Sequence, residues 1–451
     1  MRNKKSFLGA LLLVAVMLPF VASAQEGSLN AYSPYTLYGL GNLNYTGSTI
    51  FSAMGGASIG YRSEFDLKVN TTNPASLSGL PRKTFFFDVG LTGSNVYLKQ
   101  YASHHNSDIL QLRQSSYNTF NISNITIAFP IAKRLAMSLN VAPYSAVGYR
   151  IQRDETDPAV LANLGSVSYY YTGEGDINEA KASLGWEPFK GLSIGAEFIY
   201  LWGNIDRKYQ TYIRPYTGSG SYNNETNSFT GTTNEQVGRV FGGFGLQFTP
   251  INKEKTMLTL GATYRLGGKL GSEVTDYIPS GNVYSDIVRL DTLPSVNYIP
   301  QSIGVGVFFQ RPKFAIGADY IYEDWARNNS FDADNNVGYV NTNTFKLGMQ
   351  FTPNRYDVRR FFNRLTYRVG FRYNDYYLQV KGQRMNEKAV TFGVEVPFKM
   401  MSVSSLNVGV ELGERGTLRS DLIRERFFKI NVGVMLFGRD YDYWFEKYKY
   451  N

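Results

Sequence analysis

The chain has 451 residues with 46 basic and 37 acidic side chains, so its formal charge is +9, and it contains no cysteine. The positive charges are spread along the chain without basic blocks, which argues against nucleic acid binding, and the lack of cysteine excludes disulfides and lipid attachment to a cysteine. Aromatic residues make up 15% of the chain and Tyr occurs 34 times, a composition that favours a membrane interface.

The first 24 residues have the pattern of a secretory signal peptide. A basic start (Arg2, Lys4, Lys5) precedes an apolar run, and the small residues Ala22-Ser23-Ala24 end it. We expect cleavage after residue 24, which lowers the formal charge to +6 by removing these three cations. A retained N-terminal anchor is the alternative. Beyond this segment no apolar run is long enough for a membrane-spanning helix.

From Thr84 onward the dominant pattern is an alternation of apolar residues with Gly, hydroxyl or charged residues, which is typical of strands with one apolar face. Leu258, Leu260 and Ala262 alternate with Thr259 and Gly261, for example. The pattern predicts fourteen strands, at about 84–101, 116–130, 135–150, 167–187, 192–206, 235–248, 257–270, 301–310, 314–325, 342–352, 365–374, 388–397, 404–413 and 427–437.

The connections between these predicted strands alternate between short and long. An even-stranded antiparallel barrel of the outer membrane has short periplasmic turns and long extracellular loops, and it explains this order. A soluble sandwich also contains alternating strands, but it does not predict two kinds of connection in strict alternation. We therefore predict an all-β, 14-stranded antiparallel transmembrane barrel in the outer membrane of a Gram-negative cell, formed by residues 84–437, with a periplasmic tail at 438–451.

The segment 25–83 does not alternate and is rich in Gly, Ser, Tyr and Asn. Because a fourteen-stranded lumen is wider than the wall side chains can fill, we expect this segment to be a plug, or hatch, in the lumen. Inward-facing charges of the wall would hydrate the lumen and hold the plug. The predicted polar network consists of Asp88, Glu197, Arg265, Asp319, Lys346, Arg368, Arg372, Glu395 and Glu411.

Two short motifs in the N-terminal segment carry a family resemblance: Ala53-Met54-Gly55-Gly56-Ala57, and Asn73-Pro74-Ala75-Ser76-Leu77. Together with fourteen strands they resemble the FadL-type outer-membrane family of hydrophobic-compound transporters. Further stretches are similar to its Bacteroidota branch, namely 173–178, Asp319-Tyr320 with Trp325, 367–370, 413–417 and 444–447. The resemblance implies a lumenal hatch built around Gly55, Gly56, Asn73, Pro74 and Ala75, and passage of apolar molecules toward a gap in the wall. Taken alone, Asn73-Pro74 could also be an ordinary turn.

No motif for catalysis, a metal or a cofactor is apparent, so we expect no enzyme and no bound cofactor. The two histidines, His104 and His105, are adjacent and lack a third ligand. The run Asp332, Asp334 and Asn336 lacks the Gly and Glu of a calcium loop and is better explained as a solvated loop.

Two functions remain open on this sequence. The first is passive transport of hydrophobic, fatty-acid-like molecules, with outer-membrane lipid around the wall and a hydrophobic ligand or detergent in the lumen. The alternative is a structural subunit or shuttle of an assembly or secretion complex, which would bind other outer-membrane proteins or surface lipoproteins through the long loops. Aromatic loop residues suit both functions.

Overall fold

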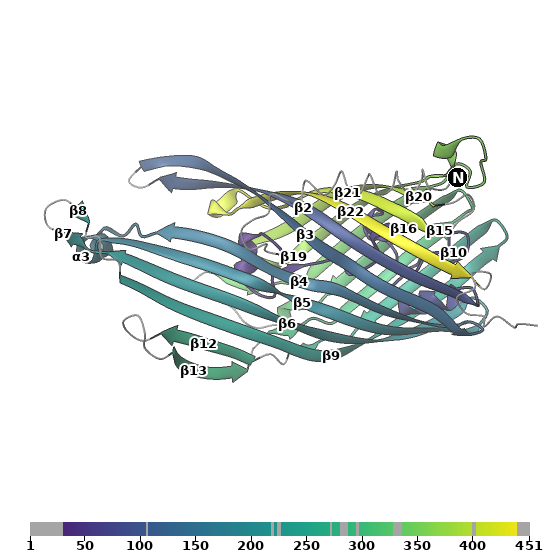
Figure 1. Ribbon diagram of the computed structural model, residues 1–451, viewed down its shortest axis with the longest axis horizontal. Coiled ribbons are helices and arrows are strands. Elements are labelled where there is room, and N and C mark those ends of the chain that lie inside the picture. Colours follow the sequence, from purple (N-terminus) through teal and green to yellow (C-terminus); the bar gives the residue numbers. More distant parts are fainter. Residues whose placement is uncertain are drawn as a thin grey trace, which may run out of the picture.

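The computed structural model describes residues 30–104, 107–217, 221–222, 227–270, 273–279, 287–294, 297–327, 336–398 and 403–439. The predicted signal peptide and most of the predicted tail therefore lie outside the described residues. Fourteen long strands form a barrel, and the elements of the N-terminal segment lie within it (Figure 1). No helix in the described part of the chain is long and apolar enough to span a membrane.

The barrel strands are β2 (Thr84–His104), β3 (Ser107–Ala132), β4 (Leu135–Asp154), β5 (Ser166–Phe189), β6 (Leu192–Arg214), β9 (Asn227–Lys253), β10 (Thr256–Arg265), β15 (Ser302–Gln310), β16 (Phe314–Glu323), β18 (Thr342–Phe351), β19 (Thr366–Val380), β20 (Gln383–Pro397), β21 (Ser405–Gly416) and β22 (Arg424–Arg439). Each pairs antiparallel with the next, and β22 pairs with β2 from Thr84–Arg439 to Lys99–Arg424. The predicted fold class is confirmed by this closed ring.

The remaining elements are short. They are η2 (Pro34–Leu37), β1 (Asn42–Leu43), α2 (Thr49–Ser52), η3 (Pro74–Gly79), α3 (Pro158–Leu164), β7 (Tyr216–Thr217), β8 (Ser221–Tyr222), β11 (Gly268–Lys269), β12 (Glu273–Pro279), β13 (Ile287–Pro294), β14 (Tyr298–Ile299), η4 (Trp325–Arg327), β17 (Val337–Tyr339), η5 (Phe361–Arg364) and η6 (Arg419–Asp421).

The wall presents many large apolar side chains to the outside, where a water-soluble protein would present mainly polar ones. Leu260 is 44% exposed, whereas its neighbour Thr259 is fully buried. Phe345, Phe392 and Leu412 are likewise exposed while Glu411 is buried. Because an exposed apolar belt around a closed ring fits lipid rather than water, the barrel is an integral protein of the outer membrane. In such barrels the short turns lie on the periplasmic side, so we assign the start of β2 and the end of β22 to this side as well.

Several strands are longer at the extracellular end than the sequence predicts, whereas β10 and β16 end earlier, at Arg265 and Glu323. Residues 375–387 were expected to form a loop, but β19 continues to Val380 and β20 begins at Gln383. A two-residue turn at Lys381 and Gly382, both with positive φ, joins them. Outside the membrane neither face needs to be apolar, so the alternation fades there although the backbone pairing continues. Figure 1 shows the extended strands β4, β5, β6 and β9 at the left.

Pairing in the wall is interrupted between β3 and β4. These strands pair only from Ala132–Leu135 to Ile125–Val141. Above this point β3 continues to pair with β2 and β4 with β5. There β1 pairs with the edge of β4 that β3 leaves free, and its Asn42 and Leu43 pair with Ala146 and Ser145. The N-terminal segment therefore completes the sheet where the neighbouring strand leaves it.

Candidate functional site: the lumen and the N-terminal segment

Residues 30–83, called here the N-terminal segment, contact strands on all sides of the ring. Ser33 donates to Glu425 of β22, the amide of Asn44 donates to the Tyr144 carbonyl of β4 at 2.9 Å, and Ser78 donates to Ser193 of β6 at 2.8 Å. The amide of Gly55 donates to Thr391 of β20 at 2.9 Å. A segment that reaches all these inward positions lies in the lumen.

Gly55 and Gly56 follow the short helix α2 and both have positive φ, +65° and +85°. The amide of Gly56 donates to the Phe51 carbonyl at 2.8 Å, which ends the helix. A Cβ on Gly55 would lie 2.6 Å from the Phe371 carbonyl oxygen of β19. Glycine is thus required here both by backbone conformation and by close approach to the wall.

Asn73 is fully buried and caps η3, accepting the Ala75 amide at 3.1 Å. Its Nδ2 is placed to donate to the carbonyls of Ile59 at 2.9 Å and Leu246 of β9 at 3.2 Å. Pro74 begins η3, and Ala75 is fully buried. Asn73-Pro74 is therefore more than a surface turn, since it joins two parts of the N-terminal segment to the wall.

Wall glycines provide the space for η3. A Cβ on Gly245 of β9 would lie 2.1 Å from the Asn73 Oδ1, and one on Gly195 of β6 would lie 2.4 Å from the Ala75 amide nitrogen. The glycines of the strands thus allow the N-terminal segment to approach the wall backbone.

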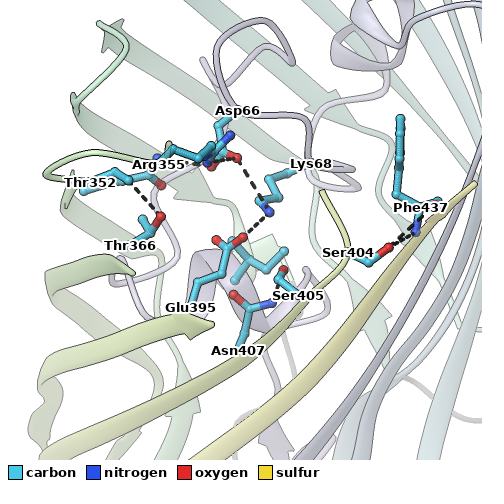
Figure 2. Close-up of polar contacts among 12 residues, drawn as sticks. Asp66, Lys68, Thr352, Arg355, Thr366, Glu395, Ser404, Ser405, Asn407 and Phe437 are labelled. Carbon is cyan, nitrogen blue, oxygen red and sulfur yellow. Dashed lines mark hydrogen bonds and ion pairs between the residues drawn. The ribbon is translucent and has the colours of Figure 1, made fainter. Parts of the chain in front are cut away.

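A buried cluster of charges joins the N-terminal segment to the wall near the periplasmic end (Figure 2). Lys68 is paired with Glu395 of β20, and with Asp66 at 3.6 Å. Arg355, in the turn after β18, contacts Asp66 at 2.7 Å. Arg368 of β19 is paired with Glu395 and lies 3.6 Å from Asp66. Burial raises the pKa of Asp66, but Lys68, Arg355 and Arg368 together hold this pKa below its usual range.

A second cluster contains Arg372 and Glu411 of the predicted network. The Arg372 guanidinium contacts Glu411 at 2.6 Å and Glu387 at 3.0 Å, and Lys429 lies 3.5 Å from Glu411. Arg415 continues this cluster, 3.7 Å from Glu387.

Asp319 of β16 accepts two amides of the N-terminal segment, from Ser58 at 2.7 Å and Ile59 at 3.0 Å. Lys346 pairs across from Asp319 in the strand register, and its Nζ lies 5.4 Å from the Tyr45 ring centre. Asp319 and Lys346, both predicted, thus contact two different turns of the N-terminal segment.

The other predicted network residues lie apart from these groups. Asp88 accepts from Asn124 at 2.8 Å on the neighbouring strand. Arg265 pairs with Glu179 at 3.5 Å. The Oε2 of Glu197 is buried, and it has no hydrogen-bond partner among the described residues. The structure therefore divides the nine predicted residues among several separate groups.

Several contacts of the N-terminal segment were not predicted. Arg62 pairs with Glu187 of β5 at 3.0 Å and donates to Ser193 at 2.7 Å. Asp66 and Lys68 were also missed, because the segment has no periodicity that assigns its side chains to a face. The only available signal was the presence of charges in a Gly- and Ser-rich stretch.

The extracellular half of the lumen is lined by apolar side chains. This inner apolar cluster combines residues of the wall with Tyr35 and Leu40 of the N-terminal segment. Its wall members include Tyr144, Val147, Tyr149, Ile177, Ile199, Leu201, Val237, Phe241, Trp325, Tyr376 and Tyr377. The extracellular half of the lumen therefore contains this apolar cluster together with the ion pairs Arg415–Glu425 at 2.8 Å and Arg207–Glu235 at 3.4 Å.

The described residues contain no group of three or more His, Asp or Glu side chains that could hold a metal. His105, Asp332 and Asp334 lie outside the described residues, as does the side chain of His104. Asn336 is described and has φ +50°.

Solved structures with this fold include hydrophobic-compound channels. They include a Pseudomonas aeruginosa FadL homologue (13% identity, 88% of this chain and 99% of that chain, TM-score 0.55) and the Pseudomonas putida toluene transporter TodX (16%, 88% and 98%, 0.53). The monoaromatic hydrocarbon channel CymD is also similar (12%, 88% and 97%, 0.51). The FadL-type architecture is confirmed as a fold, and the Bacteroidota branch stays a prediction.

A search of curated proteins found no match. A protein-family model described as BamG matches residues 4–451, which is nearly the whole chain. The chain therefore belongs to the BamG family.

Proposed function

We propose that this barrel passively carries hydrophobic, fatty-acid-like molecules across the outer membrane. The observation that supports this function is the inner apolar cluster in the extracellular half of the lumen. A water-filled porin has a polar lumen, so aliphatic and aromatic side chains turned inward would serve an apolar ligand. The shared fold with hydrophobic-compound channels is consistent with this proposal.

The interruption between β3 and β4 provides a route for such a ligand. Tyr144, Val147 and Tyr149 of β4 belong to the inner apolar cluster and lie beside the interruption. Tyr35 and Leu40 complete the cluster from the N-terminal segment. Displacement of residues 30–44 would uncover both the cluster and the β4 edge, so an apolar molecule could leave sideways into the membrane.

In this proposal the N-terminal segment acts as the hatch, and the predicted residues Gly55, Gly56, Asn73, Pro74 and Ala75 fix it to the wall. The charged cluster around Glu395 holds its periplasmic part through Asp66 and Lys68, whereas Arg415 of the second cluster contacts Asn42 in its extracellular part. Because hydrogen bonds such as that from Tyr377 to the Gly41 carbonyl also hold the extracellular part, its displacement must break these bonds as well as the apolar contacts, while the periplasmic part stays in place.

Matched substitutions in β9 test the proposal. Val237→Thr places a hydroxyl in the inner apolar cluster at nearly unchanged volume, whereas Val240→Thr makes the same change on the outer, lipid-facing side. Burying an unpaired hydroxyl costs about 1–3 kcal/mol, so Val237→Thr should weaken binding of a fluorescent fatty acid by that amount. Uptake of the same probe into vesicles should fall for Val237→Thr only. Equal uptake by both variants would contradict transport through this cluster.

A structural subunit remains the second candidate because the barrel extends far beyond the membrane. The hairpin of β12 and β13 adds to the outer part of β9, pairing from Glu273–Gln236 to Tyr277–Thr232. Such an extended sheet could dock other outer-membrane proteins or surface lipoproteins. Replacing 273–294 by a short linker should then remove copurifying proteins in mild detergent and leave probe uptake unchanged. Loss of uptake with no change in copurification would favour transport alone.

A further inference from the structure

The connection between β18 and β19 differs from the other short turns at the periplasmic end. The turns after β3, β5 and β9 have two residues each, whereas fourteen residues separate β18 from β19. Residues 353–364 of this connection are called here the rim loop. In Figure 1 this green loop projects past the outline of the barrel at the upper right. The rim loop therefore extends away from the lumen rather than only crossing between strands.

Hydrogen bonds give the rim loop a defined conformation. Asp357 accepts the amides of Arg359 at 2.8 Å and Arg360 at 2.9 Å, and its other oxygen accepts Asn363 Nδ2 at 2.5 Å. The Asn354 amide donates to the Asn363 carbonyl at 2.8 Å, which closes the loop. The side chains outside this frame are thus presented in fixed directions.

Four of those side chains are large, apolar and exposed: Tyr356, Val358, Phe361 and Phe362, with Val358 74% and Phe362 72% exposed. The hydroxyl of Tyr367, on the lipid-facing side of β19, donates to the Phe362 carbonyl at 3.1 Å. This bond places the rim loop at the lower edge of the apolar belt, where the acyl chains meet the headgroups.

The rim loop is also strongly basic. It contains four arginines and one acid, Asp357, whose oxygens are used within the loop. Arg355 is paired with Asp66, and Arg364 lies over the Phe361 ring at 5.3 Å. Arg359 and Arg360 are exposed. Lys313 in the neighbouring β15–β16 turn adds positive charge beside the rim loop, and Lys133 and Lys190 add more in distant turns at the same end of the barrel.

We propose that the rim loop binds the headgroups of anionic phospholipids in the periplasmic leaflet of the outer membrane. Exposed apolar side chains enter the boundary of the acyl region, while Arg359 and Arg360 bind the lipid phosphate. An acidic periplasmic protein would match the charge, but the Tyr367 contact places the apolar side chains beside the membrane. Through Arg355, the same loop links the leaflet to the N-terminal segment.

The experiment uses the full chain in neutral detergent, with Val358→Cys carrying an environment-sensitive fluorophore. Short-chain phosphatidylglycerol should bind saturably and shift the emission to the blue, whereas phosphatidylcholine of equal chain length and inorganic phosphate should not. Arg359→Gln with Arg360→Gln should weaken phosphatidylglycerol binding about thirtyfold, because each basic side chain near an anionic surface contributes about 1 kcal/mol and 1.4 kcal/mol corresponds to tenfold.

The matched control is Arg153→Gln with Arg214→Gln, which removes two exposed charges at the extracellular end. This pair should bind phosphatidylglycerol as the parent does. Equal weakening by both pairs would overturn the proposal in favour of a general charge effect, and so would equal binding of phosphatidylcholine. An equal response to inorganic phosphate, or a response only to an added acidic peptide, would also overturn it. All variants must keep the heat-resistant electrophoretic mobility of a folded barrel, and their substituted side chains are exposed.

Discussion

At the residue scale, close contact between the N-terminal segment and the wall depends on wall glycines, which have no side chain. Gly245 has no room for a methyl group, because atoms of Asn73 and Pro74 lie where its Cβ would be. In the same strand, a Cβ on Gly238 would find its nearest neighbour at 3.9 Å. Substituting each of the two glycines therefore distinguishes the effect of crowding against Asn73 and Pro74 from the general effect of replacing a strand glycine.

We predict that Gly245→Ala loosens η3 and that Gly238→Ala does not. Insertion of a methyl into a filled site costs about 1–3 kcal/mol, and the N-terminal segment can move away whereas the paired strand cannot. Limited proteolysis of the N-terminal segment in detergent measures the effect. If both variants are cut at the parental rate, the close approach at Gly245 is not important for docking.

The pH dependence of docking should follow Asp66. Its pKa is lowered in the folded protein, so its contribution to stability is complete above the unfolded value of about 3.9 and is lost only as the pH falls through the lower folded value. The periplasmic part of the segment should thus stay protected from an acid-active protease at pH 4 and become accessible at more acidic pH. Release already between pH 6 and 5 would contradict this assignment.

At the scale of elements, Asp66 is the common partner of Arg355 in the rim loop and of Arg368 in β19. Asp66→Asn leaves an excess of buried positive charge and should destabilise docking by about 3–5 kcal/mol. Adding Arg355→Gln removes one of the uncompensated charges, so the double variant should lose less than the sum of the single losses. Accessibility of the N-terminal segment to proteolysis, followed against denaturant, tests this; strict additivity would rule out the coupling.

The strands of the wall could be predicted from the sequence, whereas the packing of the lumen could not. Alternation locates β10 and assigns Thr259 to the inner face, because lipid imposes one apolar face on every strand. It does not show that Thr259 is fully buried against the N-terminal segment. That segment satisfies irregular contacts one at a time, so Arg62, Asp66 and Lys68 leave no periodic pattern. The resemblance drew attention to Gly55 and Asn73, but their partners required the structure.

At the scale of the whole molecule, the orientation can be tested with the two ends of β5. Lys190 follows β5 in a short turn, and Asn163 precedes it in the exposed helix α3. On intact cells a membrane-impermeant maleimide should label Asn163→Cys and not Lys190→Cys. Labelling of the Lys190 position alone would invert the assignment of the two ends.

Removal of the N-terminal segment should convert the barrel into an ion-conducting channel. The ring closes through β2 and β22 without it, so a variant lacking residues 25–82 should still insert into membranes. The inward charges would then be hydrated, and large conductance steps should appear in planar bilayers, whereas the parent should show none. A deletion variant as silent as the parent would show that the wall or the loops block the lumen.

The closed ring around the N-terminal segment also constrains the order of assembly. Asn42 and Leu43, which complete the β4 edge, lie near the start of the described chain, and the pairing that closes the ring needs the last long strand, β22. If β22 joins β2 while the N-terminal segment is still outside, its correct position can be reached only by threading through the finished cylinder. Capture of the segment before β22 pairs with β2 would avoid this threading step.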